Sequence, residues 1–387
     1  MYRPAGPGQN AEMDLLVAAD DRTGALETAA ALADRLGTPV AVYAWSTWQA
    51  GLSGSPDAAA AVAVVDVGTR HLSPGDARAR IDDLPATGRA AHKLDSTLRG
   101  NWPDELAVYA ERRPILLVPA LPEQGRTCVD GVVLQHGRPV HEGGAGSDVR
   151  RRVTSSRPAE HLRAAGVPDV FELADLDGIT AWLAEPAGIA VADAATDDDI
   201  TAAVAAWACG RDDVVLAGTS AVIGAAVPAH GAVAAPPVID GPILVVCGSV
   251  HPAARAQLTE AERSGIPVAT IADHLTARLL TDAGVLVLAT EIPVGDVDEP
   301  LAVAAATALA AGVADLRRDV ALGALVVIGG DTASAVFGES AISVQGTAAP
   351  GTAWARVAGF DMPVITRSGG FGSERALVDL VRGTLRS

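Results

Sequence analysis

The sequence predicts an α/β fold of two domains, each a mainly parallel sheet flanked by helices. Three observations predict it: short apolar runs, amphipathic stretches between them, and a break in composition within the 387 residues. The runs are rich in Val, Ile and Leu and show no polar alternation, which is typical of strands buried on both faces of a parallel sheet. They lie at residues 15–19, 61–65, 115–118, 214–217, 243–247, 285–289 and 324–328.

Helical periodicity lies between these runs. After Thr23, the apolar positions 26, 29, 30, 33 and 36 fall on one face of a helix, and Gly37 is expected to end it. The last helix is expected to begin with Ser373 as its N-cap and to bury positions 377, 380, 381 and 385. Strands that alternate with helices predict right-handed crossovers between parallel strands.

The break in composition lies at residues 230–242, which are rich in Pro, Ala and Gly and have no periodicity. A new apolar run begins directly after it. We therefore expect one domain at residues 13–230 and a second at residues 241–387. A chain of this length is long enough for each of the two to bury a core of its own.

The chain is acidic, with 47 acidic and 29 basic side chains and a formal net charge of −18. Such a charge argues against binding to nucleic acid or to an anionic membrane surface. No apolar run reaches 18 residues, so no transmembrane helix is expected, and the first twelve residues lack the layout of a signal peptide. The three cysteines (Cys128, Cys209 and Cys247) predict neither a disulfide framework nor a zinc site. We expect a soluble cytoplasmic protein; whether it forms a homodimer is left open.

Ligands of open parallel sheets bind beyond the carboxyl ends of the strands, so the residues that follow each run are the functional candidates. Asp20 and Asp21 follow the first run, where two adjacent carboxylates need a cation, a metal or a sugar hydroxyl. The alternative for one of them is a helix N-cap. Arg70 follows the second run, where it could clamp a carboxylate with two hydrogen bonds or form an ordinary surface ion pair.

The densest polar stretch is residues 92–101, in which eight of ten residues are polar or glycine. It contains Lys93, the only lysine among 29 basic residues, together with Asp95 and Arg99. Cations suit an acid group, and carboxylate and hydroxyl side chains suit sugar hydroxyls, so this mixture fits an anionic polyol. A turn stabilised by its own Ser and Thr side chains is the alternative. The loop at residues 119–127 is equally compatible with a structural role and with a site.

Three glycine turns in the second domain, at residues 248–252, 329–332 and 367–373, each join a predicted strand to a predicted helix. Free amides and the helix dipole make such turns anion sites, although glycine also serves tight strand–helix geometry alone. Three turns in one domain predict a phosphate cradle. The sequence contains no Walker A motif, no Rossmann fingerprint after the first strand, no H-E-x-x-H and no G-x-S-x-G.

Together these stretches resemble the four-carbon acid sugar kinase family, which includes kinases of threonate, erythronate and 3-oxo-tetronates. The resemblance covers most of the chain, and HKLDSTLRGN (92–101) is its most specific part. The other matching motifs are AADDRTGALETA (18–29), VDVGTR (65–70), PALPEQGRTCVDG (119–131), CGSVHPAARAQL (247–258), GGDTASAV (329–336) and RSGGFGS (367–373).

The resemblance implies a kinase that moves the γ-phosphoryl group of ATP, with Mg²⁺, to the terminal hydroxyl of a four-carbon sugar acid. The N-terminal domain would bind the acid and the C-terminal domain the nucleotide. Catalytic roles are implied for Asp20, Asp21, Lys93 and Asp95. Substrate contacts are implied for Arg22, Arg70, Ser96, Thr97, Arg99 and Gly100. Nucleotide contacts are implied for Ser249, His251, Gly329, Gly330, Asp331, Thr332, Gly369, Gly370, Phe371 and Gly372.

Three positions depart from the family pattern. Arg22 stands where Leu is usual, which would add a cation beside the acid site, and the stretch HEGGAGSD (141–148) is compressed and Gly-rich. Arg367 stands where Lys is common. The alternatives to a kinase are a phosphatase or another enzyme of phosphorylated sugar acids, and a non-catalytic sensor that binds a sugar acid.

Overall fold

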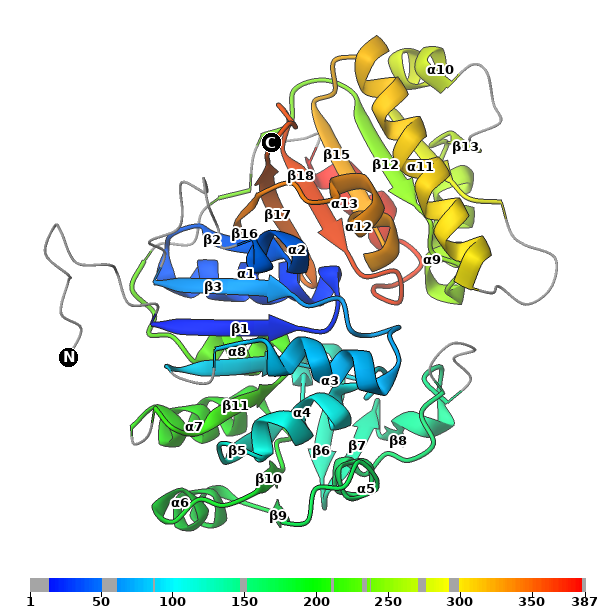
Figure 1. Cartoon of the computed structure of the whole chain (residues 1–387). Coiled ribbons are helices and arrows are strands. Elements are labelled where there is room, and N and C mark those ends of the chain that lie inside the picture. Colours follow the sequence, from blue (N-terminus) through cyan, green and yellow to red (C-terminus); the bar gives the residue numbers. More distant parts are fainter. Residues whose placement is uncertain are drawn as a thin grey trace, which may run out of the picture. The chain divides into compact units, whose positions relative to one another are not determined.

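The computed structural model describes residues 14–50, 61–85, 88–146, 152–209, 212–231, 235–236, 238–270, 276–291 and 299–384. The chain divides into two compact units, whose elements Figure 1 labels. Unit 1 comprises Met1–Leu36 and Val40–His230. Unit 2 comprises Gly37–Pro39 and Gly231–Ser387.

Unit 1 is built on a parallel sheet with the strand order β2, β3, β1, β4, β11, β5, β10, β9. In chain order these strands are β1 (Leu15–Ala19), β2 (Val40–Ala44), β3 (Val62–Asp66), β4 (Ala90–Lys93), β5 (Ile115–Val118), β9 (Val170–Leu173), β10 (Ile189–Ala192) and β11 (Val215–Gly218). Every residue of β1 is buried, as its unbroken apolar run predicts.

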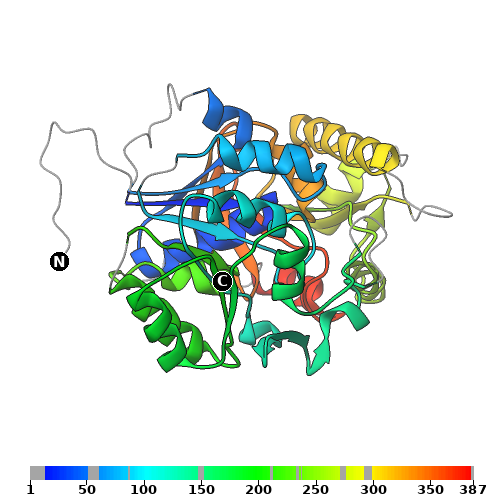
Figure 2. The ribbon, with the colours of Figure 1, turned by 60° about the horizontal axis from the view of Figure 1, so that its bottom comes forward.

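Helices cover both faces of this sheet (Figure 2). One layer contains α1 (Arg22–Leu36), which packs against α8 (Ser220–Ala225). In another layer α3 (Pro74–Asp82) packs against α4 (Trp102–Ala110). The remaining helices of the unit are α2 (Trp45–Gln49), α5 (Pro158–Ala164), α6 (Leu176–Ala184) and α7 (Asp197–Ala208).

A small antiparallel sheet follows β5 in unit 1. A 3₁₀ turn at Pro122–Gln124 leads into β6 (Arg126–Val129), which pairs with β7 (Val132–Gln135). The third strand, β8 (Arg138–Pro139), pairs with β7 and precedes a second 3₁₀ turn at Val140–Glu142. Residues 147–151, within and just after the compressed Gly-rich stretch, lie outside the described part of the chain.

Unit 2 has a mixed sheet with the strand order β13, β14, β12, β15, β18, β17, β16. The first five strands are parallel: β12 (Ile243–Cys247), β13 (Val268–Ala269), β14 (Val285–Ala289), β15 (Ala324–Ile328) and β18 (Val364–Arg367). The other two, β16 (Ile342–Ala349) and β17 (Thr352–Val357), form an antiparallel hairpin on β18.

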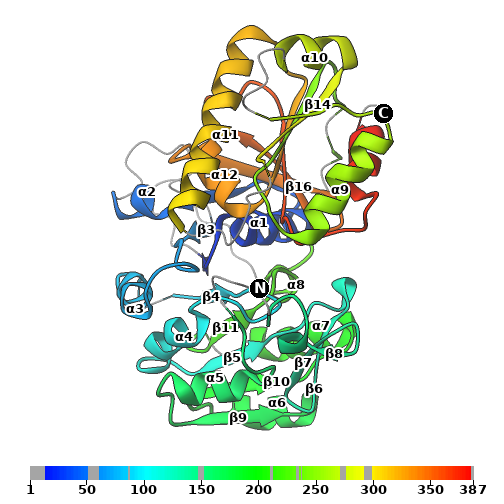
Figure 3. The same cartoon turned by 90° about the vertical axis from the view of Figure 1, so that its right-hand side faces the viewer.

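Two pairs of helices pack together in unit 2, as Figure 3 shows from the side. On one side α11 (Glu299–Asp319) packs against α12 (Gly330–Phe337). On the other α9 (Pro252–Arg263) packs against α13 (Ala376–Thr384). The shorter α10 (Thr276–Ala283) lies beside β14.

Among the described helices, α11 alone has the length and hydropathy of a membrane span, over Pro300–Asp319. Its side chains Leu309, Val313 and Leu316 are buried and recur at intervals of four and three. Since the helix also packs against α12, this spacing is that of an amphipathic helix on a sheet domain.

The predicted fold class is confirmed: both units are α/β and their sheets are mainly parallel. All seven predicted strands form, five with the expected bounds and two shifted by one residue, β3 and β11. Gly37 ends α1 with a φ of 69°, as predicted. The predicted N-cap of the last helix is wrong, because α13 begins at Ala376 and Ser373 lies in the preceding turn. Residue 385, expected on its buried face, lies outside the described residues.

Candidate functional site

The polar candidates of unit 1 meet at the carboxyl ends of three neighbouring strands. Ala19 at the end of β1 lies opposite Asp66 of β3 and opposite Lys93 of β4. The residues that follow these ends therefore share one edge of the sheet, which is where ligands of parallel sheets bind. We call the side chains of Asp20, Asp21, Arg70, Lys93, Asp95 and Arg99 the acid–base cluster.

Arg70 is the centre of the acid–base cluster. Its Nε and Nη2 donate to Oδ2 and Oδ1 of Asp20 at 2.8 and 2.9 Å. Its Nη1 lies 2.9 Å from Oδ2 of Asp21, and its Nη2 lies 3.7 Å from Oδ1 of Asp95. One guanidinium thus holds three carboxylates: Nε and Nη2 bind Asp20, Nη1 faces Asp21, and Nη2 also faces Asp95. Arg70 is therefore engaged within the chain, and its contact with the substrate stays a prediction.

The two adjacent aspartates differ in their surroundings. The side chain of Asp20 is fully buried, whereas that of Asp21 is 16% exposed. Asp21 also caps α1, because its Oδ1 accepts from the amide of Gly24 at 2.8 Å and its Oδ2 accepts from the hydroxyl of Thr23 at 2.7 Å. The N-cap alternative thus holds for Asp21, which nevertheless keeps a surface that a ligand can reach.

These surroundings separate the pKa values of the carboxylates. Burial raises the pKa of Asp20 from 3.8 to about 6, against the opposing effect of Arg70. Burial also raises the pKa of Asp21, but Arg70, Lys93 and the two capping hydrogen bonds outweigh it and lower the value overall. The pKa of Asp95 lies well below its usual range, because Arg99 and Arg70 outweigh the effect of burial. Asp21 and Asp95 are therefore ionised at neutral pH.

The raised pKa of Asp20 makes the stability of the fold depend on pH. Because the folded chain holds this proton more tightly than the unfolded chain, the stabilisation is full below about pH 4 and is lost as the pH rises through about 6. Asparagine does not titrate, so we expect the Tm of wild type relative to Asp20→Asn to fall between about pH 4 and 7 and then level off. Thermal unfolding across that range measures it; a constant difference in Tm contradicts the assignment.

Lys93 lies beside the paired aspartates. Its Nζ donates to the carbonyl of Leu94 at 2.8 Å, and its charge acts on both Asp20 and Asp21. A Cβ atom added at Gly24 would lie 3.2 Å from that Nζ, so the first turn of α1 closes over the ammonium. Since an ammonium has three donors, Lys93 retains donors for a bound acid group.

The loop after β4 folds around Asp95. Its carboxylate accepts from the amide and the hydroxyl of Thr97 and from Nε and Nη2 of Arg99, at 3.0 and 2.9 Å for the arginine. Gly100 has a φ of 101°, and a Cβ atom there would lie 3.3 Å from Oδ2 of Asp20. Ser96 is half-buried in the same loop. The structure thus brings Gly100 beside Asp20 and links Asp95 to the aspartate pair through Arg70.

Arg22 forms an ion pair within the chain. Its Nε donates to Oδ2 of Asp66 at 2.6 Å, and both side chains are buried. Asp66 also accepts from the amide of Gly68. The extra cation therefore pairs with a carboxylate at the end of β3, and its contact with the substrate stays a prediction.

Arg126, whose role the sequence leaves undecided, lies near the acid–base cluster. Its Nη1 donates to Gln124, whose amide in turn donates to Glu27 of α1 at 3.2 Å. Burial lowers the pKa of Arg126, and the carboxylates of Asp95 and Glu27 partly oppose that effect. Arg126 lies in a proline-bounded loop after β5, and this position in the sequence does not predict its link through Gln124 to Glu27.

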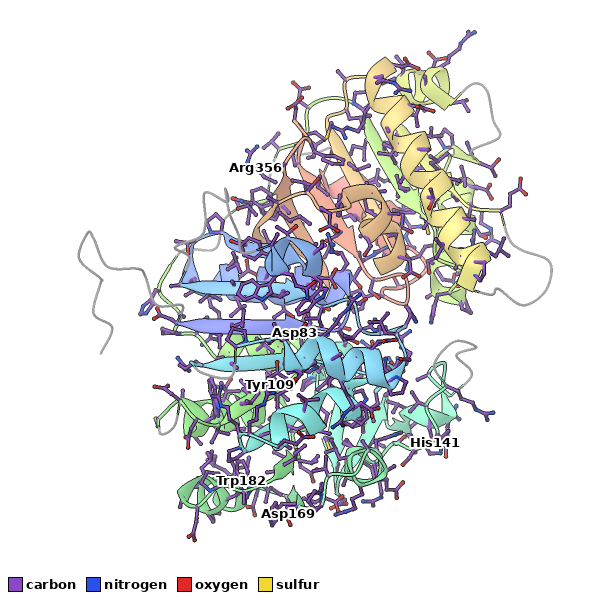
Figure 4. The ribbon with its side chains drawn as sticks, in the orientation of Figure 1. Asp83, Tyr109, His141, Asp169, Trp182 and Arg356 are labelled. Carbon is purple, nitrogen blue, oxygen red and sulfur yellow. The ribbon has the colours of Figure 1, made fainter. Side chains whose placement is uncertain are left out.

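A second contact that the sequence does not predict lies behind β4. His92 Nε2 lies 2.8 Å from Oε2 of Glu105 on α4, and both side chains are fully buried. Tyr109, labelled in Figure 4, packs its ring edge-on against His92 with centroids 5.7 Å apart. These contacts join α4 to β4, the strand that ends in Lys93. They therefore help to fix the position of that strand.

The three glycine turns of unit 2 converge. A Cβ atom added at Gly369 would lie 2.6 Å from Cβ of Ser249, and one added at Gly329 would lie 3.8 Å from the same atom. Ser249 therefore sits between the turn after β15 and the turn after β18. A Cβ atom at Gly248 would collide with the hydroxyl of Thr332. The approaches at Gly248 and Gly369 leave no room for a side chain, and together these contacts bring the three turns close to one another.

The remaining nucleotide candidates have individual positions. His251 caps α9, its Nδ1 accepting from the amide of Ala253 at 3.1 Å, and a Cβ atom at Gly370 would lie 3.4 Å from its Nε2. Asp331 is exposed in the first turn of α12. The ring of Phe371 covers Gly351 in the hairpin between β16 and β17, which indicates a packing role. Gly330 and Gly372 belong to the same turns.

Within the described residues, no group of three or more His, Cys, Asp and Glu side chains could hold a metal ion. The carboxylates of the acid–base cluster are paired with Arg70 and Arg99, and the charge of Lys93 acts on Asp20 and Asp21, so they are not a set of free anionic ligands.

Comparison with known proteins identifies both parts of the chain. Residues 15–226 match a sugar-binding N-terminal domain, and residues 244–377 match a nucleotide-binding C-terminal domain. The chain is 28% identical to a D-threonate kinase of Salmonella typhimurium over 95% of this chain and 97% of that protein. It is 30% identical to a D-threonate kinase of Bordetella bronchiseptica, over 94% and 95%.

A crystal structure of a Salmonella typhimurium protein superposes with a TM-score of 0.70 at 20% identity, over 95% of this chain and 98% of that one, which shows a shared fold. The domain matches and the kinase relatives cover nearly the whole chain. The chain therefore belongs to the four-carbon acid sugar kinase family, as its motifs predict, and is a carbohydrate kinase.

Proposed function

We propose that this kinase transfers the γ-phosphoryl group of ATP to the terminal hydroxyl of a four-carbon sugar acid, and that D-threonate is the first acid to test. The proposal depends on the position of Lys93. Its ammonium has donors left for an acid group and lies beside the two aspartates at the ends of the strands. The D-threonate kinase relatives support the choice of acid.

In this mechanism Lys93 binds the substrate carboxylate, and Asp21 orients the terminal hydroxyl and accepts its proton as phosphoryl transfer proceeds. Asp21 is preferred to Asp20 because part of its side chain is exposed, whereas the side chain of Asp20 is fully buried. Arg70 and Arg99 hold the three carboxylates in place. We assign residues 13–230 to the sugar acid and residues 241–387 to the nucleotide.

The converging turns of unit 2 would bind the phosphates through backbone amides. Magnesium usually reaches such sites with the nucleotide, held by phosphates, water and one or two carboxylates. Asp331 could supply such a carboxylate, because it is exposed in the first turn of α12, which follows the glycine turn at residues 329–330. When bound, Mg²⁺ neutralises phosphate charge. The reaction itself requires the acid and the nucleotide to meet with water excluded.

The direct test measures ADP release from ATP with threonate, erythronate and their 3-oxo relatives as acceptors. We expect turnover with at least one of these acids and none without an acceptor. Release of inorganic phosphate from a phosphorylated acid, without consumption of ATP, would indicate a phosphatase instead. Binding of an acid without any turnover would indicate a sensor. Either result would contradict the proposed function.

A further inference from the structure

Arg367 is a buried cation beneath a glycine turn of unit 2. It is the last residue of β18 and only 4% exposed, with β15 and β17 on either side. Its carbonyl accepts from the amide of Gly329 at 2.9 Å. The residue therefore lies where the turn after β15 and the turn after β18 come together.

No carboxylate of the described residues forms an ion pair with Arg367. Its Nη2 donates to Oε1 of Gln257, and its buried Nε has no hydrogen-bond partner in this part of the chain. Burial lowers the pKa of Arg367 to about 10 and outweighs the opposing effect of Cys247. A charge that has been removed from water is costly unless it is paired, so this guanidinium lacks a counter-ion.

Arg367 is directed at the turn that follows it. A Cβ atom added at Gly372 would lie 3.4 Å from its Nη1. Gln257, which binds Nη2, donates from its own amide to the carbonyls of Phe371 and Gly372 at 2.8 and 3.4 Å. The buried side chain of Gln257 therefore links the guanidinium of Arg367 to the turn after β18. It does so by binding two carbonyls of that turn.

A purely structural role does not require a charge at this position. A linear apolar side chain would fill the same space without the cost of burying a cation. An anion bound at the turn supplies the missing counter-charge, and the turn already offers amides to such an anion. The phosphates of a nucleotide are the anions that a nucleotide-binding domain receives.

We propose that Arg367 is a phosphate-binding cation whose counter-ion is the phosphate chain of the nucleotide, and that Gln257 is the residue that positions it. The proposal rests on nucleotide binding by unit 2 and deepens that part of the proposed function. It does not depend on which acid is phosphorylated.

The test compares the full-length chain with Arg367→Met, Arg367→Lys and the control Arg382→Met. Arg382 is exposed on α13 and donates to the carbonyl of Ser264, so its loss removes an arginine of the same unit outside the turns. Calorimetry and thermal shifts are recorded with ATP, ADP, AMP and adenosine, in the absence of any sugar acid.

For Arg367→Met we expect the affinity for ATP and ADP to fall by about 10- to 100-fold, as for loss of a charge-assisted hydrogen bond, and that for adenosine to change by less than about twofold. The Tm without nucleotide should stay the same or rise, because an unpaired buried charge has been removed. Arg367→Lys should retain more affinity for ATP than Arg367→Met. The control Arg382→Met should bind ATP, ADP, AMP and adenosine with wild-type affinity.

Two results would overturn the proposal. A lower Tm without nucleotide, with equal loss of affinity for all four ligands, would show that Arg367 only supports the structure. Unchanged ATP and ADP affinity would show that it has no role in binding. A wild-type chain that binds ADP but phosphorylates no tetronate would contradict the proposed function alone.

Discussion

Replacing Lys93 with methionine is expected to lower kcat/KM for the sugar acid by about 100-fold, mainly through KM, since a charge-assisted contact to a bound acid is lost. The ammonium lies between the aspartate pair and the first turn of α1 and is the cation of the acid–base cluster that is least engaged by the chain itself. Steady-state kinetics by ADP release, with the acid varied at saturating ATP, measures the effect.

Two control variants show whether the loss of activity is specific to the Lys93 ammonium. Arg35→Met removes a cation from the last turn of α1, where it donates to the carbonyl of Val227, and should leave kcat/KM unchanged. Lys93→Arg keeps the charge but is not expected to restore activity, because Gly24 closes over the ammonium and a planar guanidinium is larger. The affinity for ADP should stay at its wild-type value in both Lys93 variants. If Lys93→Met retained kcat/KM within about twofold, Lys93 would not bind the acid.

The buried parallel strands could be predicted from the sequence because a short, unbroken run of Val, Ile and Leu is typical of a strand covered on both faces. The strand β12 has the expected bounds, and all five of its residues are buried. The hairpin of β16 and β17 could not be predicted in this way. The first six residues of β16 alternate between buried and half-buried, and the strand includes Ser343, Gln345 and Gly346, so no apolar run marks it. Its position depends on pairing with β17, which is a tertiary contact.

In the site, too, the sequence predicts the positions of residues but not their tertiary contacts. Sequence order places polar residues after strands, so it predicts which side chains reach the edge of the sheet. It does not predict how the charges pair: Arg22 binds Asp66 while Arg70 binds Asp20, and an exchange of these partners would be equally consistent with the spacing. The sequence predicts that the three glycine turns share one site, but it does not predict that Ser249 lies between Gly329 and Gly369, because that contact joins three loops far apart in the chain.

Replacing Asp21 with asparagine is expected to separate its role as a helix cap from its role as a proton acceptor. Asparagine caps helices about as well as aspartate, so the hydrogen bond to the amide of Gly24 persists, and the Tm should fall only by the loss of the ion pair with Arg70. Asparagine cannot accept a proton from the substrate hydroxyl, so kcat should fall by about 10²- to 10⁴-fold while KM changes much less. Kinetics and thermal unfolding on the same preparations measure both quantities.

Asp21→Ala provides the matched comparison. It removes the cap as well as the carboxylate, so it should lose kcat to the same extent and also destabilise the fold by about 1 kcal/mol. If Asp21 only capped α1, Asp21→Asn would be nearly as active as wild type, and Asp21→Ala would lose stability without a specific loss of kcat. Because the two hypotheses predict opposite rankings of activity for the asparagine variant, one pair of substitutions decides between a capping residue and one that touches the reacting hydroxyl.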